Sequence, residues 1–183
     1  KDVLVKYSSA GDHADRTASA SKDGLKRISG GTLDLEASEN NNMVKLQSGS
    51  WNNKMDLMIE VPYGFDVKVS SYNDGDIMIS NIDGEVEVTT YNGGVSAQNI
   101  SGSVIATTYN GEIKVSFTKV REGAPMSYST YNGDIDITFP ANLKALFKMK
   151  TEQGEILSGF DMKMIEAGPI QKQDTKAGTY KVV

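Results

Sequence analysis

The sequence contains no cysteine and a single histidine among its 183 residues. Without cysteine the chain has no thiolate nucleophile, no cysteine metal site and no disulfide framework. His13 alone cannot form a multi-histidine metal site, and we expect it to be an exposed residue of a polar N-terminal stretch. We therefore expect neither a metal nor a cofactor.

Long apolar runs are also missing. No stretch approaches the roughly 18 residues of a membrane-spanning helix. The first residues do not resemble a signal peptide. The compartment stays open at this point, because the chain is either cytoplasmic or lost an export signal before Lys1.

Basic residues are scarce relative to acidic ones, 19 against 24, which gives a net charge of −5. Nucleic acids and anionic membrane surfaces both select basic faces, so neither is an expected partner. Hydrophobic residues make up 38% of the chain and glycine occurs 18 times. This composition favours many short strands joined by tight turns, and the length fits one domain, 1–183.

Glycine is what the sequence has in a regular pattern, at 75, 84, 93, 102 and 111, each nine residues after the last. Aligned on glycine, the units read YNDGDIMIS, NIDGEVEVT, TYNGGVSAQ, NISGSVIAT and TYNGEIKVS. Their aliphatic sixth and eighth positions alternate with polar or small ones, as in a strand with one buried face. The Asp-Gly, Asn-Gly and Ser-Gly pairs suit a turn. The sixth position holds Ile77, Val86, Val95, Val104 and Ile113, and the eighth holds Ile79, Val88, Ala97, Ala106 and Val115.

The units alternate between Tyr-Asn-Gly and Asn-Ile-x-Gly turns, so the full repeat is about 18 residues with two strands and two corners. A fixed repeat indicates stacked coils, which bury their apolar faces against copies of themselves. We predict an all-β fold, a right-handed parallel β-solenoid of about 18–20 residues per coil. An antiparallel meander with Asn-Gly hairpins is the alternative.

Stacked coils would place equivalent residues above one another. Tyr91, Tyr109 and Tyr131 should then form one ladder, and Asn92, Asn110 and Asn132 a second ladder along the corner. Counted from the aliphatic positions that follow them, the tyrosines should point inward and fill the corner of the core.

The regular pattern has limits. We expect N-terminal strands and a cap over 1–54, regular coils over 55–160 and a C-terminal cap over 161–183. The segment 117–129 reads as a loop inserted into one coil. Irregular ends would protect the exposed strand edges of a solenoid against aggregation.

Carboxylates cluster after the corner glycines, where Glu112, Asp134 and Glu155 should share one edge with Asp76. Neighbouring carboxylates about 5 Å apart repel unless a cation or a lysine lies between them. One interpretation is a solvated acidic edge, and the other is a weak cation site or a rim that contacts a sugar. A calcium β-roll is excluded, because its aspartate position holds core residues such as Ile77 here.

Trp51 lies between turns in SGSWNNK. A tryptophan in such a loop stacks on a sugar or caps an apolar edge, and capping is favoured. It joins Glu112, Asp134 and Glu155 as a candidate surface contact.

The alternation of "VP…V.V…YNGDI" with "NI.GEVEV" over roughly 55–160 resembles the bacterial adhesin-like domains of unknown function. The residues that carry the resemblance, besides the Tyr-Asn-Gly turns, are Val61, Pro62, Ile82, Ile100, Phe139 and Pro140. The resemblance implies a right-handed β-helical repeat and an extracytoplasmic location in secreted or envelope proteins, common in Bacteroidetes. It implies no catalytic or binding residues.

We therefore expect a non-enzymatic, extracytoplasmic structural or adhesion-type module, with a surface glycan or an envelope protein as partner. The first alternative is a carbohydrate-active enzyme or a carbohydrate-binding β-helix, and the second is an envelope-associated sensing or regulatory domain. A glycosidase needs two carboxyls facing across a cleft, and the sequence singles out no such pair. The loops are short apart from 117–129, whose basic residues are Lys119 and Arg121.

Overall fold

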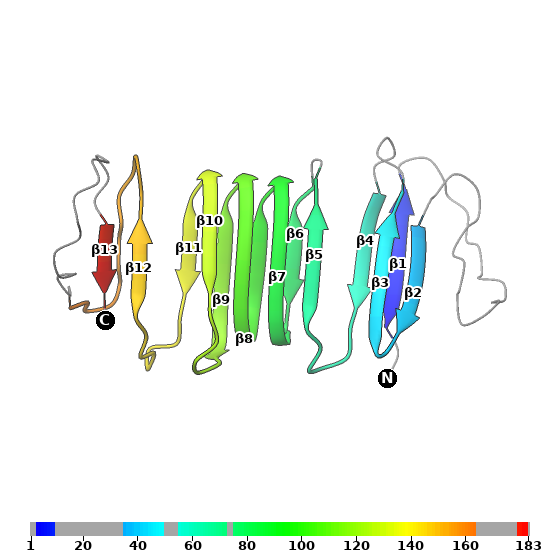
Figure 1. Cartoon of the computed structure of the whole chain (residues 1–183), viewed down its shortest axis with the longest axis horizontal. Helices are drawn as coiled ribbons and strands as arrows, with labels where there is room; N and C mark the ends of the chain where they lie inside the picture. The colour runs from blue at the N-terminus through cyan, green and yellow to red at the C-terminus, as the bar shows by residue number, and fades with distance from the viewer. Residues whose placement is uncertain (1–2, 10–34, 50–54, 73–74, 164–178, 183) are drawn as a thin grey trace. The chain divides into compact units, whose positions relative to one another are not determined.

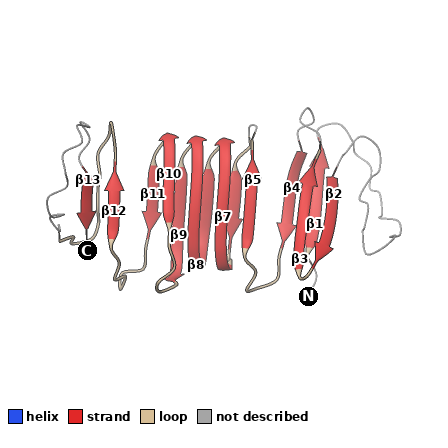
Figure 2. Ribbon diagram, viewed as in Figure 1, coloured by secondary structure: helices blue, strands red, loops and turns tan. Residues whose placement is uncertain are grey.

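The structure is a computed structural model that describes residues 3–9, 35–49, 55–72, 75–163 and 179–182. The described residues form β-strands joined by turns, and they include no helix (Figure 2). Accordingly, they contain no helix that is long and apolar enough to cross a membrane. The chain divides into two compact units, Lys1–Thr138 and Phe139–Val183.

Seven strands of the first unit form a β-solenoid, in which every strand pair is parallel (Figure 1). They are β5 (Val67–Ser71), β6 (Ile77–Ser80), β7 (Asp83–Asn92), β8 (Val95–Asn110), β9 (Ile113–Val120), β10 (Ser127–Asn132) and β11 (Ile135–Thr138). β8 turns the corner between the two faces: its first part pairs with β6 and β9, and its last part with β7 and β10. The predicted solenoid is confirmed and the antiparallel meander is wrong.

The register gives the length of each coil, because paired residues lie one coil apart along the chain. Val67 pairs with Val86, and Val86 pairs in turn with Val104. These separations agree with the coil length expected from the glycine spacing. Ile113 pairs with Ile135 across a longer stretch of chain, because the last coil contains the insertion.

The core consists of columns of aliphatic side chains at matching positions of successive coils. Val86, Val104 and Ile113 are 2%, 0% and 0% exposed. Val88 pairs with Ala106 in the same way, and both are buried completely. Burying such columns stabilises the folded chain by about 25 cal/mol per Å² of apolar surface. This burial depends on the alternation of the sequence, because only every second side chain of a strand points inward.

The insertion is shorter than the predicted loop over 117–129. β9 continues to Val120 and β10 begins at Ser127, so only 121–126 connects them. Phe117 pairs with Ile100 and is 7% exposed. The loop prediction is wrong for Phe117, because its ring occupies the core position that Ile100 holds in the preceding coil.

The remaining strands pair antiparallel. β1 (Leu4–Ser9) pairs with β4 (Met55–Glu60), β2 (Leu35–Asn40) with β3 (Met43–Ser48), and β12 (Phe147–Lys150) with β13 (Thr179–Val182). Parallel pairing therefore extends over 67–138, a shorter run than the regular coils expected over 55–160.

Candidate functional site

One corner of the solenoid is built from the tetrapeptide Thr-Tyr-Asn-Gly, which occurs at 90–93, 108–111 and 130–133. It closes β7, β8 and β10 in turn. Its four residues have four different surroundings, and together they determine what this edge of the molecule presents to solvent.

The threonine points into the corner. Thr108 is 3% exposed, and its Oγ1 donates a hydrogen bond to the carbonyl oxygen of Gly93 over 3.1 Å. Thr130 Oγ1 donates in the same way to the Gly111 carbonyl over 3.0 Å. A buried hydroxyl needs such a partner, because an unsatisfied one costs about 1–3 kcal/mol.

The glycine permits the close approach of successive coils. Gly111 has φ of 157°, and a Cβ atom there would collide with the carbonyl oxygen of Gly93 on the preceding coil. No other residue type fits at this position without moving the backbone.

The asparagines form the predicted ladder. Asn110 Nδ2 donates to Asn92 Oδ1 over 2.9 Å, and Asn132 Nδ2 donates to Asn110 Oδ1 over 2.8 Å. Each amide thus joins its own coil to the preceding one, and the predicted corner ladder is confirmed.

The tyrosines form a continuous stack of four rings. Ring centroids lie 5.3 Å apart for Tyr72 and Tyr91, 4.9 Å for Tyr91 and Tyr109, and 4.7 Å for Tyr109 and Tyr131. The rings of the last two pairs are nearly parallel, at 2° and 5°. These spacings match the separation of paired strands. The predicted ladder is confirmed, and Tyr72 extends it by one ring.

The predicted direction of these tyrosines is wrong. Tyr91 and Tyr109 are 41% and 40% exposed, and Tyr72 and Tyr131 are 73% and 72% exposed. The alternation runs within the preceding strand, from buried Val104 through Thr108 to exposed Tyr109. It does not continue across the corner glycine, so counting back from the next strand reverses the assignment.

A row of hydroxyl side chains runs beside the tyrosines. Ser70 pairs with Thr89, Thr89 with Thr107, and Ser129 with Thr107, and all four residues are exposed. The sequence signal is the pattern Ser/Thr-Ser/Thr-Tyr, which precedes Asn in all four coils. Sequence reasoning missed this row because it followed the aliphatic, tyrosine and asparagine positions and not the hydroxyl residues before them.

We call the outward residues within 68–72, 87–91, 105–109 and 127–131, at β5, β7, β8 and β10, the tyrosine face. They are Lys68, Ser70, Tyr72, Glu87, Thr89, Tyr91, Ile105, Thr107, Tyr109, Ser127, Ser129 and Tyr131. Its two charged side chains form an ion pair, with Lys68 Nζ 2.8 Å from Glu87 Oε1. Eight residues of this face, the hydroxyl row and the tyrosine row, form what we call the neutral strip.

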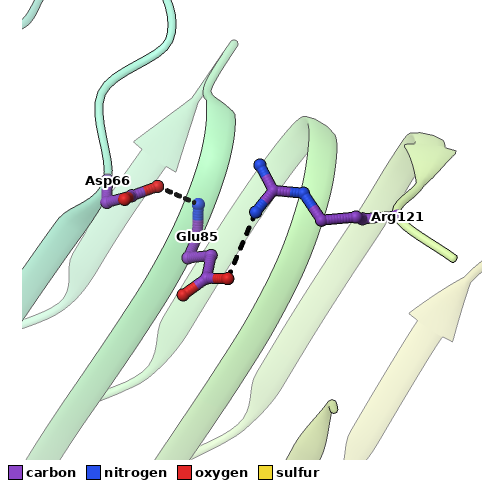
Figure 3. A network of polar contacts seen from close by, with 3 residues as sticks. All are labelled: Asp66, Glu85 and Arg121. Atoms are coloured by element: carbon purple, nitrogen blue, oxygen red, sulfur yellow. Dashed lines mark hydrogen bonds and ion pairs between the residues drawn. The ribbon is translucent and has the colours of Figure 1, made fainter. Parts of the chain in front are cut away.

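A polar network of three residues lies near the start of β7, the opposite end from Tyr91 (Figure 3). Arg121 Nη1 contacts Glu85 Oε1 over 3.1 Å, two coils away, and the Glu85 backbone N–H donates to Asp66 Oδ1 over 2.7 Å. Ser103, the register partner of Glu85, is 5% exposed although it lies at an outward position. Arg121 is thus a clamp between coils, and this role was not foreseen from its place in the insertion.

The opposite side of the solenoid, which we call the acidic face, comprises the outward residues of β6, the first part of β8, β9 and β11, with the residues after the corner glycines. They are Asp76, Met78, Ser80, Gly94, Ser96, Gln98, Glu112, Lys114, Ser116, Asp134, Asp136 and Thr138. A shallow depression of about 190 Å³ on this face is lined by side chains that include Gln98, Lys114 and Asp136. Ligand pockets usually measure roughly 300–1,000 Å³.

The structure brings together two of the predicted carboxylates, Glu112 and Asp134, on adjacent coils of the acidic face. Lys114 intervenes, with its Nζ 2.6 Å from Glu112 Oε1. The hydrogen bond and the charge of Glu112, with smaller contributions from Asp136 and Asp134, raise the pKa of Lys114. Asp76 Oδ1 accepts a hydrogen bond from the Gly94 backbone N–H over 2.8 Å.

The other predicted positions lie elsewhere. Glu155 is exposed and belongs to the second unit. Trp51 and His13 lie outside the described residues. The part of the chain that the structure describes contains no group of three or more histidine, aspartate or glutamate residues that could hold a metal ion.

These features define an all-β solenoid domain with stacked side-chain ladders. The chain belongs to the Toastrack DUF4097 family of unknown function, whose profile matches residues 71–182. No curated protein and no solved structure matches the chain.

Proposed function

We propose that this chain is a non-catalytic, extracytoplasmic module of the structural or adhesion type, and that the tyrosine face is its contact surface. One observation carries the proposal, the exposed stack of four tyrosines beside a row of four hydroxyl side chains. Aromatic residues presented together at a surface are typical of interaction sites.

The exposure of these rings is not required by the core. Val86, Val104 and the threonines of the corner complete the interior without them. Stacking between rings adds about 0.5–1.5 kcal/mol for each pair, which stabilises the coils but does not require a hydroxyl row alongside. The combination of the two rows supports a contact role beyond stability.

The roles of several described carboxylates support a non-catalytic module. Asp66 and Asp76 accept hydrogen bonds from backbone N–H groups. Glu85 forms an ion pair with Arg121, and Glu112 forms one with Lys114. These groups stabilise strand edges and corners. The extracytoplasmic location is supported by the sequence resemblance to envelope-associated domains, and the absence of cysteine makes the fold independent of the redox compartment.

The location is tested by surface proteolysis and antibody labelling of intact source cells, compared with lysed cells. We expect labelling of intact cells or recovery from the medium. Protection in intact cells together with release into the cytosolic fraction would contradict the proposal.

The contact role is tested with beads that carry the full chain, washed over isolated cell-envelope material under flow. We expect the double variant Tyr91→Ser/Tyr109→Ser to reduce retention several-fold, and the acidic-face control Gln98→Ser to leave it unchanged. Equal retention of both variants would show that the tyrosine face is not the contact surface.

A further inference from the structure

The neutral strip stands out electrostatically in an acidic chain with 23% charged residues. All eight of its outward side chains carry hydroxyl groups and none carries a carboxylate or an amine. The nearest charged row contains Lys68 and Glu87, which neutralise one another over 2.8 Å. The strip therefore offers hydrogen-bond donors and acceptors without a net charge.

This lack of charge narrows the class of ligand. An anionic polymer needs unpaired cations, but Lys68 and Arg121 are both engaged with glutamates. A lipid or another apolar ligand needs an apolar surface, and Ile105 is the one aliphatic side chain on the tyrosine face. A peptide strand cannot extend the sheet at β7 or at the last part of β8, because the backbone groups of these two strands pair with neighbouring coils on both sides.

The geometry of the tyrosine rings narrows the class of ligand further. In the stack, Tyr91 and Tyr109 each turn both ring faces toward a neighbouring ring, so solvent meets mainly their edges. Tyr72 and Tyr131 are nearly twice as exposed, because each has one ring face without a stacked tyrosine. A ligand that runs along the stack would meet repeated hydroxyl contacts, with ring stacking available only at the two ends.

We propose that the neutral strip binds a linear, uncharged polysaccharide that lies along the solenoid axis across the four coils. The inference rests on the contact role proposed for the tyrosine face and specifies its ligand. Sugar hydroxyls donate and accept hydrogen bonds as the serine, threonine and tyrosine hydroxyls do. Each contact is weak, and the affinity comes from repetition of the same contacts from coil to coil.

The test is native affinity electrophoresis and calorimetry of the full chain with linear polysaccharides. The neutral probes are hydroxyethylcellulose, glucomannan and a soluble linear (1,3)-β-glucan, and the anionic probe is polygalacturonate. We expect retardation by at least one neutral probe and none by polygalacturonate.

Two matched variants locate the site. Thr107→Glu places a carboxylate in the middle of the strip, and Thr138→Glu places one at an exposed strand position of the acidic face. We expect Thr107→Glu to weaken binding about tenfold or more, because the glycan would have to desolvate an unpaired charge. Thr138→Glu should bind as wild type does. Circular dichroism establishes that each variant is folded, and Tyr131→Ser at the end of the stack replaces Thr107→Glu if that chain does not fold.

Equal binding by Thr107→Glu and Thr138→Glu, binding to polygalacturonate alone, or binding to none of the neutral probes would overturn the inference. A cytosolic location with intact glycan binding would instead contradict only the proposed extracytoplasmic role. Retention on envelope material that depends on the tyrosines, without binding to any neutral glycan, would leave the contact role standing and point to a protein partner.

Discussion

The two faces of the solenoid share one interior and differ in how regularly their outward side chains repeat. On the tyrosine face two of the outward rows repeat the same chemistry from coil to coil, hydroxyl upon hydroxyl and ring upon ring. On the acidic face one outward row reads Met78, Ser96, Lys114 and Asp136, without a common property. Parallel stacking allows uniform rows on both faces, and the tyrosine face has two of them side by side.

The difference shows which features the fold requires and which it leaves free. Inward positions must be aliphatic on both faces because they fill a common core. Outward positions have no such requirement, as the mixed row of the acidic face demonstrates. The regularity of the tyrosine face is therefore a property of its own, added to a fold that does not need all of it.

The largest expected effect comes from the corner that joins the two faces. In Gly111→Ala the new Cβ would collide with the Gly93 carbonyl oxygen, so the strand pairing of both faces should be destabilised. We expect a loss of more than about 3 kcal/mol in the free energy of unfolding, or failure to fold. The measurement is urea unfolding monitored by circular dichroism.

Gly159→Ala is the control for this substitution, because a Cβ there meets nothing within 4 Å. It should change the free energy of unfolding by less than about 0.5 kcal/mol. A wild-type unfolding curve for Gly111→Ala would refute the close approach of the coils.

Truncating a core valine should cause a smaller loss of stability, and the loss should be equal behind the two faces. Val104 lies behind the tyrosine face and Val95 behind the acidic face, and they are 0% and 2% exposed. Each change to alanine removes two methylene equivalents and leaves a cavity, for a loss of about 2 kcal/mol. Losses that differ by more than about 1 kcal/mol in chemical denaturation would show that the interior is not shared equally.

The tyrosine stack should contribute stability that the acidic face lacks. Tyr109→Ala removes two ring-stacking contacts and should lower the free energy of unfolding by about 1–3 kcal/mol. Tyr131→Ala removes one such contact and should lower it by about half as much. Gln98→Ala on the acidic face should be nearly neutral. Thermal and urea unfolding of the three variants decide the point, and equal values for all three would mean that the stack adds no stability.

The smallest expected effect is a change in the free energy of unfolding at alkaline pH. Burial raises the pKa of Tyr128, the inward tyrosine of β10, well above its ordinary value of 10.0. The unfolded chain then releases this proton before the folded chain does, so the free energy of unfolding falls above about pH 10 by up to about 1.4 kcal/mol per pH unit. The raised pKa of Lys114 acts in the same direction: its contribution is complete below its ordinary value of 10.5 and is lost as pH rises through the raised pKa.

The measurement is urea unfolding at about pH 8 and about pH 11. Between these conditions Tyr128→Phe should lose about 1 kcal/mol less stability than wild type, and Lys114→Gln should show a smaller difference of the same sign. An equal alkaline loss in wild type and Tyr128→Phe would show that Tyr128 is not buried in the folded protein.

Much of the fold follows from local chemistry that is visible in the sequence. The positions of Val86 and Val104 predict one buried column and those of Val95 and Ile113 a second, because alternation places every second side chain inside. Fixed glycine spacing predicts stacked coils, because each repeat can bury its apolar face only against a copy of itself. The asparagine and tyrosine ladders follow from that register.

The candidate site was less predictable, because it depends on how alternation behaves at corners. Tyr109 reads as inward from the strand after it and as outward from the strand before it, and the conformation of Gly111 decides between them. The core role of Phe117 and the clamp of Arg121 to Glu85 also escaped prediction. Both depend on residues from different coils meeting across the register.

The sequence by itself determined the all-β class, the repeat of about 18 residues and the aliphatic columns, because strand alternation and turn chemistry act over a few neighbouring residues. Only the tertiary structure decided that the tyrosines face solvent, that a hydroxyl row lies beside them, and that Lys114 neutralises Glu112 at the acidic edge. These features arise from contacts between coils, and the distance between two coils is set by the hydrogen bonds of the paired strands rather than by the side chains that meet.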